Sequence, residues 1–229
     1  AMSDCAELVG IDWHQSDHLI SFLKDNQVDL VVVGPEAPLV AGLADILNKA
    51  EIPVFGPSKA AAQLEGSNVF AKDLMKKYNI PTATYGVFHK VDEAKEFIAQ
   101  TGAPIVVKAD GLAAGKGVVV AMTIEEANAA VEDMLSGNRF GEAGSTVVIE
   151  EFMEGEEASL LAFVDGKTVV PMIASQDHKR IFDGDKGPNT GGMGTYAPAP
   201  VLTDVLRAEA MKTILEPMVA AMEKEGMPY

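Results

Sequence analysis

One stretch decides how this chain folds: Val107-Lys108-Ala109-Asp110-Gly111-Leu112-Ala113-Ala114-Gly115-Lys116-Gly117-Val118-Val119-Val120. Apolar, β-branched runs at both ends predict two neighbouring strands, Ile105–Val107 and Val118–Val120. Between them, glycines expose backbone N–H groups and two lysines add positive charge, which together suit a phosphate. The stretch therefore predicts a flap that joins two strands and closes over phosphates.

Two familiar phosphate motifs are excluded. A P-loop needs four residues between its glycines and Ser or Thr after its lysine, whereas three residues separate Gly111 from Gly115 and Gly117 follows Lys116. The dinucleotide fingerprint needs G-x-G-x-x-G before a helix, and here a strand follows. The remaining alternative is a mobile hairpin without a ligand.

Composition narrows the classes of partner. The chain has 229 residues, 48% hydrophobic, with 18 Lys and Arg against 34 Asp and Glu, a net charge of −16. This charge repels nucleic-acid backbones and anionic lipids, so neither is expected as a partner. The single cysteine, Cys5, excludes an intramolecular disulfide and fits a cytoplasmic protein. No apolar run approaches the roughly 20 residues that span a bilayer.

The first 66 residues predict an α/β domain. Strands are expected at Val28–Gly34 and Ile52–Gly56, with helices at Ser16–Asn26 and Pro38–Ala50. Alternating strands and helices are typical of a doubly wound parallel sheet, so the two strands should pair in parallel. Because open sheets usually hold about 4–6 strands, this sheet is predicted to be incomplete.

The rest of the chain predicts a mixed α and β domain. Helices are expected at 67–78, 91–100, 123–135 and 204–225, the last kinked at Pro217, and strands at 82–88, 146–152, 158–164 and 168–173. Ser67 and Thr123 are predicted N-caps. Asp165-Gly166 predicts a hairpin turn. Residues 174–200 lack periodicity and are expected to form a long loop, either functional or disordered.

A strand end near residue 150 is suited to a nucleoside. The backbone there can bind a base edge, Phe152 and Met153 can form an apolar wall, and the Glu157 carboxylate can accept hydrogen bonds from ribose hydroxyls. The alternative is a solvated acidic turn.

A second polar loop is suited to a charged substrate. Lys179 and Arg180 can hold an anion, and Asp177 can hold an amine or a metal-bound water. Glycines at 191, 192 and 194 allow a substrate to approach the backbone closely. The alternative is a disordered surface loop.

Taken in order, these motifs resemble the ATP-grasp superfamily and, within it, the phosphoribosylamine–glycine ligase family. The resemblance rests on Val33–Leu39, Phe55–Pro57, Lys108–Gly117, Ser175–Arg180 and Gly187–Gly194. It implies an ATP-grasp fold with an α+β lid and an antiparallel core subdomain, preceded by the incomplete parallel-sheet domain. The implied boundaries are 1–66 for the first domain and 67–229 for the ATP-grasp domain, with the lid at about 83–151.

The resemblance also implies an activity: ATP-dependent ligation of glycine to 5-phosphoribosylamine in purine biosynthesis, through a glycyl phosphate, with Mg²⁺ or Mn²⁺. Protein partners are not indicated. The implied ATP-binding residues are Lys72, Lys108, Gly111, Gly115, Lys116, Gly117, Glu150, Glu151, Phe152, Met153 and Glu157. The implied catalytic residues are Asp177, Lys179, Asn189 and Gly191, and the implied substrate-binding residues are Pro35, Glu36, Arg180, Gly192, Met193 and Gly194.

Two family features are not matched: an N-terminal glycine-rich turn for the ribose phosphate, and the metal-binding Glu-x-Asn pair, which in the family follows the position of Tyr229. No metal ligand is therefore assigned within this chain, and the expectation is an inactive fragment of the ligase. The alternatives are a non-catalytic nucleotide-binding module and a different ATP-grasp enzyme, such as a carboxylase or peptide ligase. The loops at 177–180 and 189–194 argue against a different ATP-grasp enzyme.

Overall fold

The chain divides into two compact units, Ala1–Gln63 and Leu64–Tyr229. The computed structural model describes residues 2–111, 117–136, 145–184 and 186–229, with the backbone alone at Met2, Lys186, Pro188 and Asn189. Among the described residues, no helix has the length and apolarity needed to cross a membrane.

The N-terminal unit is a small α/β layer. Its elements are a 3-10 helix (Met2–Asp4), α1 (Ser16–Asp25), β1 (Val31–Val32), α2 (Glu36–Ala41), α3 (Leu43–Lys49) and β2 (Val54–Phe55). Strands β1 and β2 pair in parallel, with Val31 opposite Val54, which confirms the predicted orientation. Leu23, Leu43, Leu47 and Ile52 form the core where α1 and α3 meet the strands.

The predicted helix Pro38–Ala50 is interrupted. Gly42 has φ of 98°, ends α2 and precedes α3. An ordinary residue is strained in this left-handed conformation, whereas glycine adopts it freely. The apolar periodicity continues across the break, so the sequence pattern alone indicated one helix. The predicted strand Val28–Gly34 is likewise shorter, because only Val31 and Val32 have a strand partner among the described residues.

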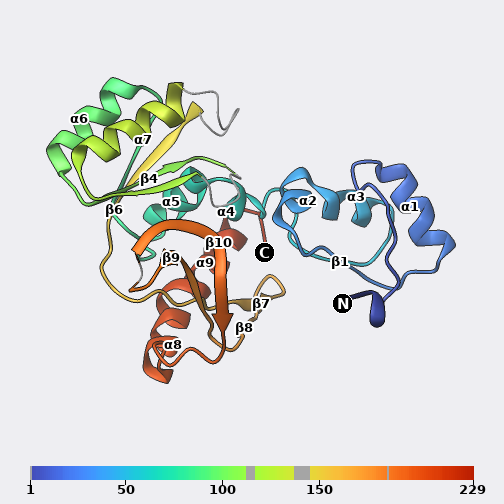
Figure 1. Cartoon of the computed structure of the whole chain (residues 1–229). Helices are drawn as coiled ribbons and strands as arrows, with labels where there is room; N and C mark the ends of the chain where they lie inside the picture. Colours follow the sequence, from blue (N-terminus) through green and yellow to red (C-terminus); the bar gives the residue numbers. More distant parts are fainter. Residues whose placement is uncertain (1, 112–116, 137–144, 185) are drawn as a thin grey trace. The chain divides into compact units, whose positions relative to one another are not determined.

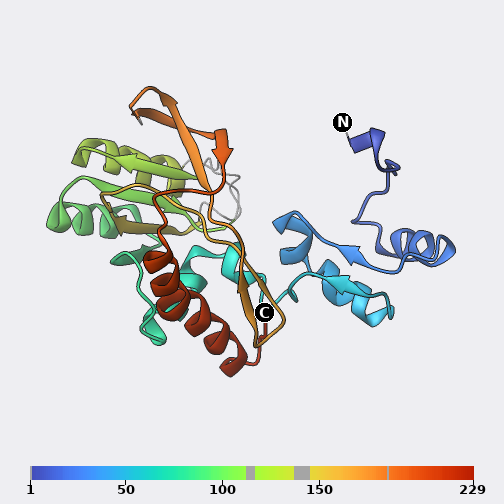
Figure 2. The ribbon, with the colours of Figure 1, turned by 90° about the horizontal axis from the view of Figure 1, so that it is seen from below.

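The C-terminal unit is built around a four-stranded antiparallel sheet. Helices α4 (Gln63–Gly66) and α5 (Asn68–Lys77) lead into β3 (Tyr85–Phe88), α6 (Val91–Thr101), β4 (Ile105–Ala109), β5 (Val118–Ala121), α7 (Ile124–Ser136) and β6 (Val147–Glu151). The strand order is β3-β6-β4-β5. Figures 1 and 2 show α6 and α7 side by side along one face of this sheet. Ile98, Val131, Val107 and Ile149 form the core between the helices and the strands.

The helix caps of this unit follow the sequence signals. The Ser67 side chain accepts a hydrogen bond from the Phe70 N–H at the start of α5, as predicted. At α7, the Glu126 N–H donates to Thr123 Oγ1, and the Glu126 carboxylate accepts from the Met122 N–H. The predicted capping arrangement at Thr123 is thereby confirmed.

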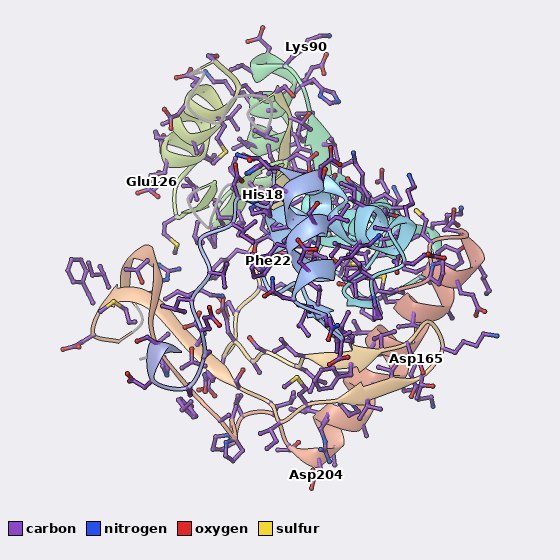
Figure 3. All side chains as sticks on the ribbon, turned by 90° about the vertical axis from the view of Figure 1, so that its right-hand side faces the viewer. His18, Phe22, Lys90, Glu126, Asp165 and Asp204 are labelled. Atoms are coloured by element: carbon purple, nitrogen blue, oxygen red, sulfur yellow. The ribbon has the colours of Figure 1, made fainter. Side chains whose placement is uncertain are left out.

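Two hairpins and a long helical segment follow. Strands β7 (Ala162–Val164) and β8 (Val169–Pro171) pair antiparallel around the predicted turn, where Asp165 lies (Figure 3). Strands β9 (Gln176–Phe182) and β10 (Lys186–Tyr196) form the second hairpin. The chain continues with α8 (Asp204–Ala210), a π-helical turn (Met211–Leu215) and α9 (Glu216–Lys224). Asp204 marks the start of α8 in Figure 3.

The prediction of a long loop at 174–200 is therefore wrong. Gln176 lies opposite Tyr196, and Asp177 lies opposite Thr195, within an antiparallel ladder. Both strands carry polar residues and glycine, so they lack the apolar alternation by which strands are usually recognised. Backbone hydrogen bonds and side-chain pairs hold the hairpin instead.

The final helix is interrupted where the kink was expected. A proline has no N–H to donate and its ring crowds the carbonyl four residues earlier, which disturbs the regular helical ladder. Here the π-helical turn immediately precedes α9, whose second residue is Pro217. The far end of α9 returns to α5, where the Glu225 carboxylate accepts hydrogen bonds from Lys77 Nζ and the Tyr78 hydroxyl, each at 2.5 Å. These two bonds lower the pKa of Glu225.

Candidate nucleotide site

Strand alternation presents charged residues on the sheet face away from α6 and α7. In β4, Ile105, Val107 and Ala109 are buried against the helices, so Val106 and Lys108 belong to the opposite face. Glu150 of β6 is directly opposite Val106, which places it on that same face. The sheet register therefore brings a lysine and a glutamate from distant parts of the chain together.

Helix α5 contributes a second lysine to this face. Lys72 Nζ and Lys108 Nζ each lie 3.0 Å from the same oxygen, Glu150 Oε2. Lys72 Nζ also donates to Thr82 Oγ1 at 2.8 Å. Both Lys72 and Glu150 are buried, with residue exposures of 9% and 5%. Two cations thus share one internal carboxylate.

Only one of the two oxygens of the Glu150 carboxylate has partners among the described residues. Glu150 Oε1 is buried and has no hydrogen-bond partner among the described residues. A buried carboxylate oxygen without a donor is costly, so this atom is suited to receive a hydrogen bond from a bound molecule. The site consequently offers two ammonium groups and one free acceptor.

The neighbouring residues on β3 and β6 are also in defined positions. The Glu151 carboxylate accepts from the Thr84 N–H at 3.1 Å. Hydrogen bonds from Thr84 lower the pKa of Glu151, with a smaller contribution from the charge of Lys72. Desolvation, together with a 2.6 Å bond to Asp73, raises the pKa of Tyr85 to about 12. The Tyr85 ring lies 5.9 Å from Lys72 Nζ.

The end of β6 leads directly to the second hairpin. Phe152 is half-buried and Met153 is 67% exposed, so both are accessible beyond the strand end. The Glu157 carboxylate lies 3.2 Å from Lys179 Nζ on β9. This ion pair links the segment after Glu150 to the predicted substrate side.

The β9–β10 hairpin holds Asp177 beside a glycine-rich strand. Thr195 Oγ1 donates to Asp177 Oδ1 at 3.2 Å. A Cβ on Gly192 would lie 3.3 Å from that oxygen, and Gly192 has φ of 118°. Glycine at this position is therefore favoured by the positive φ, and a larger residue would also crowd the Asp177 carboxylate.

Two further bonds shape this hairpin. Thr190 Oγ1 donates to the Lys179 carbonyl oxygen at 2.9 Å, and Arg180 Nη1 donates to the Gly187 carbonyl oxygen at 3.1 Å. Arg180 thereby uses one of its donors internally. The strand also presents accessible groups, because Met193 is 60% exposed. A Cβ at position 191 or 194 would meet no described atom within 4 Å, which leaves the backbone of these two glycines approachable.

The other predicted residues fall into three groups. Pro35 and Glu36 start α2 in the N-terminal unit, so their predicted role stays a prediction. Gly115 and Lys116 lie outside the described residues, whereas Gly111 and Gly117 flank that interval. Asn189 is described by its backbone, opposite Arg180.

Sequence reasoning missed Thr82 and Asp110. Thr82 supplies the hydroxyl that orients Lys72, and its only signal was its place at the start of a predicted strand. The Asp110 carboxylate accepts hydrogen bonds at the start of α5, although its sequence neighbours indicated only a glycine loop. Neither contact has a sequence spacing that would reveal it.

No metal centre is formed by the described residues. They contain no group of three or more His, Cys, Asp and Glu side chains placed to hold an ion. One Glu-x-Asn pair does occur, at Glu126 and Asn128, but Glu126 is engaged in capping α7 and lies at its exposed start (Figure 3). This pair is therefore not evident as a metal site.

Comparison with known protein families identifies the chain. Residues 1–65 match the N domain of phosphoribosylglycinamide synthetase, and residues 66–229 match its ATP-grasp (A) domain. The chain belongs to the phosphoribosylglycinamide synthetase family. The family resemblance and the ATP-grasp fold expected from the sequence are thereby confirmed.

Similar proteins carry consistent names. Phosphoribosylamine–glycine ligases from Vibrio parahaemolyticus and Halalkalibacterium halodurans are 54% and 56% identical, over all of this chain and 53% of each relative. The chain thus spans about half the length of the relatives it matches. A crystal structure of phosphoribosylamine–glycine ligase from Thermotoga maritima aligns with a TM-score of 0.69 and 41% identity, over 77% of this chain and 44% of that one.

More distant structures share the fold alone. The biotin carboxylase domain of the Hydrogenobacter thermophilus 2-oxoglutarate carboxylase, solved with MgADP, aligns with a TM-score of 0.73 at 17% identity, over 93% of this chain and 48% of that chain. N5-carboxyaminoimidazole ribonucleotide synthetase from Thermus thermophilus aligns with a TM-score of 0.67 at 21% identity, over 97% of this chain and 54% of that chain.

Proposed function

We propose that this chain is the nucleotide-binding part of an ATP-dependent carboxylate–amine ligase that joins glycine to 5-phosphoribosylamine. The products are glycinamide ribonucleotide, ADP and phosphate, in purine biosynthesis in the cytoplasm. The names of the relatives support the substrates. We take residues 1–66 as a partial first domain and 67–229 as the ATP-grasp domain, with the lid at about 83–151.

The observation that carries the proposal is the shared carboxylate of Glu150. Lys72 and Lys108 converge on one oxygen of Glu150, and the negative charge of this carboxylate offsets the repulsion between the two ammonium groups. ATP phosphates are anions of the same kind, so they can take over as partners of the two ammonium groups. The free oxygen, Glu150 Oε1, can accept a hydrogen bond from the exocyclic amine of adenine.

The chemistry proposed is phosphoryl transfer followed by acyl transfer. A glycine carboxylate oxygen attacks the γ-phosphorus, ADP leaves, and glycyl phosphate forms. The amine of phosphoribosylamine then attacks the acyl carbon, loses a proton and expels phosphate. Lys72 and Lys108 would offset charge on the phosphates during the first step, because such transfers depend mainly on positioning and electrostatic stabilisation.

The remaining residues have positional roles in this proposal. Phe152 and Met153 would flank the adenine, and Glu157 would accept from the ribose hydroxyls once Lys179 turns to a substrate anion. Asp177 would hold an amine, and the glycines of β10 would let the substrates approach. Mg²⁺ or Mn²⁺ would supply further charge neutralisation; since the described residues form no ligand cluster, we assign it no step.

Calorimetry of ATP binding tests the proposal. Truncating one partner of a desolvated charge pair costs about 2–5 kcal/mol. Because the Lys108 side chain is 26% exposed, Lys108→Ala should reduce the binding free energy of ATP by about 2 kcal/mol. This loss corresponds to a rise in Kd of about thirtyfold. Lys212→Ala, on the π-helical turn, is the matched control and should leave Kd unchanged. Equal ATP affinity of the unmodified chain and Lys108→Ala would reject the assignment.

A further inference from the structure

Asp110 bonds to the helix that carries Lys72. Its Oδ1 accepts hydrogen bonds from Ser67 Oγ and the Val69 N–H, both at 3.1 Å, and Oδ2 lies 3.2 Å from Ser67 Oγ. Ser67 Oγ at the same time accepts from the Phe70 N–H. Helix α5 thus has two capping side chains. Ser67 accepts from one helical N–H, and Asp110 accepts from the Ser67 hydroxyl and from a second helical N–H.

Asp110 is also tied to the two strands of the site. It follows the last residue of β4, two positions after Lys108, and its own N–H donates to the Thr146 carbonyl oxygen at 3.0 Å. Thr146 immediately precedes β6, which carries Glu150. The bonds of this one residue therefore join the three elements that bring Lys72, Lys108 and Glu150 together.

A neighbouring contact reinforces the junction between α5 and β4. Asn68 Nδ2 donates to the Ala109 carbonyl oxygen at 3.1 Å. The negative carboxylate of Asp110 also complements the positive end of the helix dipole of α5. Lys72 lies less than two turns along this helix, so at 1.5 Å per residue it is only about 5–8 Å along the axis from the residues that Asp110 holds.

We propose that Asp110 is a positioning residue that sets the separation of Lys72 and Lys108 by holding the start of α5 against the end of β4. That the two lysines bind nucleotide phosphates rests on the proposed function. Asp110 itself touches no phosphate in this proposal. It acts through the two lysines, so its loss should affect recognition of phosphate more than recognition of the nucleoside.

The test compares Asp110→Ala, Asp110→Asn and a control cap variant, Thr203→Ala. Thr203 is the N-cap of α8, where its Oγ1 accepts from the Leu206 N–H, so its loss removes a cap in the same unit away from the site. ATP and adenosine affinities are measured by calorimetry for each. Asp110→Ala should weaken ATP binding about tenfold, as misplacement of binding groups does, and adenosine binding less than twofold.

Asp110→Asn should recover most of the ATP affinity, because its amide oxygen can still accept from the Val69 N–H. Thr203→Ala should change neither affinity. If Asp110→Ala binds ATP within twofold of the unmodified chain, or loses ATP and adenosine affinity equally, the positioning role is refuted.

Amide hydrogen exchange separates this result from the proposed function. Asp110→Ala should speed exchange at Val69 and Lys72 in α5 together with the amides at the end of β4, whereas Thr203→Ala should affect α8 alone. If the unmodified chain binds no ATP, the proposed function fails, and the exchange data still decide whether Asp110 couples the two elements. Loss of protection confined to Val69 would show that it does not.

Discussion

Replacing Glu150 by glutamine should destabilise the C-terminal unit severely. The substitution keeps the size of the side chain and removes its charge. Each Nζ lies 3.0 Å from the same Glu150 oxygen, so the ammonium groups of Lys72 and Lys108 are close together. In the variant, a neutral amide would stand between them in place of the carboxylate. Both ammonium groups would lose their counter-ion while the fold still restricts their access to water.

The structure sets the size of this effect. Breaking a buried ion pair by removing one partner costs about 3–5 kcal/mol. The side chain of Lys72 is 11% exposed and that of Lys108 is 26% exposed, so water partly screens the second cation. We therefore expect a loss of about 2–4 kcal/mol in the free energy of unfolding.

Urea unfolding measures this loss. With a slope of about 2 kcal/mol per molar urea, the midpoint should fall by about 1–2 M. Exchange of the amide protons of β4 and β6 assigns the transition to the C-terminal unit. Glu157→Gln is the matched control, because Glu157 forms a pair with Lys179 whose side chains are 70% and 45% exposed. Exposed pairs contribute about 0–1 kcal/mol.

Equal midpoints for Glu150→Gln and Glu157→Gln would refute the reasoning. That result would mean that the lysines escape to water when Glu150 is neutral, so the carboxylate would not be what holds them together.

Three further outcomes are expected. Gly192→Ala should destabilise the β9–β10 hairpin by about 1–2 kcal/mol because of its positive φ, whereas Gly191→Ala, in open space, should not; hairpin amide exchange distinguishes them. The pKa of Glu225 is lowered in the folded state, so its contribution to stability is present above the ordinary pKa of 4.5 and is lost as pH falls through the lower folded value. The difference in melting temperature between the unmodified chain and Glu225→Gln should therefore shrink between pH 7 and pH 3. Finally, the 229-residue chain should release no ADP above background with glycine, phosphoribosylamine, ATP and Mg²⁺; turnover at roughly 1–10³ s⁻¹ would contradict its expected inactivity.

The elements with strong apolar patterns were predictable from the sequence. β-Branched runs around the glycine stretch indicated β4 and β5, and the predicted caps at Ser67 and Thr123 are present. These features depend on residues close together in the chain, so local sequence carries them. The same applies to the family, since its motifs are contiguous.

Elements that depend on backbone pairing were less evident. The β9–β10 hairpin has no apolar alternation, and its strands become visible only once Gln176 and Tyr196 are seen opposite each other. The break at Gly42 was hidden for a related reason. The apolar periodicity continues across Gly42, whereas its left-handed φ ends the helix and leaves no mark in that pattern.

For the candidate site, the sequence by itself determined which residues are charged and that Lys108 ends a strand before a glycine-rich loop. The family resemblance assigned Lys72, Lys108 and Glu150 to one ATP site, and tertiary structure alone decided that both lysines meet the same carboxylate oxygen, Glu150 Oε2. Their meeting depends on the register that puts Glu150 opposite Val106 and on the docking of α5 through Asp110. Register and docking are set by long-range packing and hydrogen bonds, and these contacts join residues about 40 or more positions apart, where no local pattern in the chain can record them.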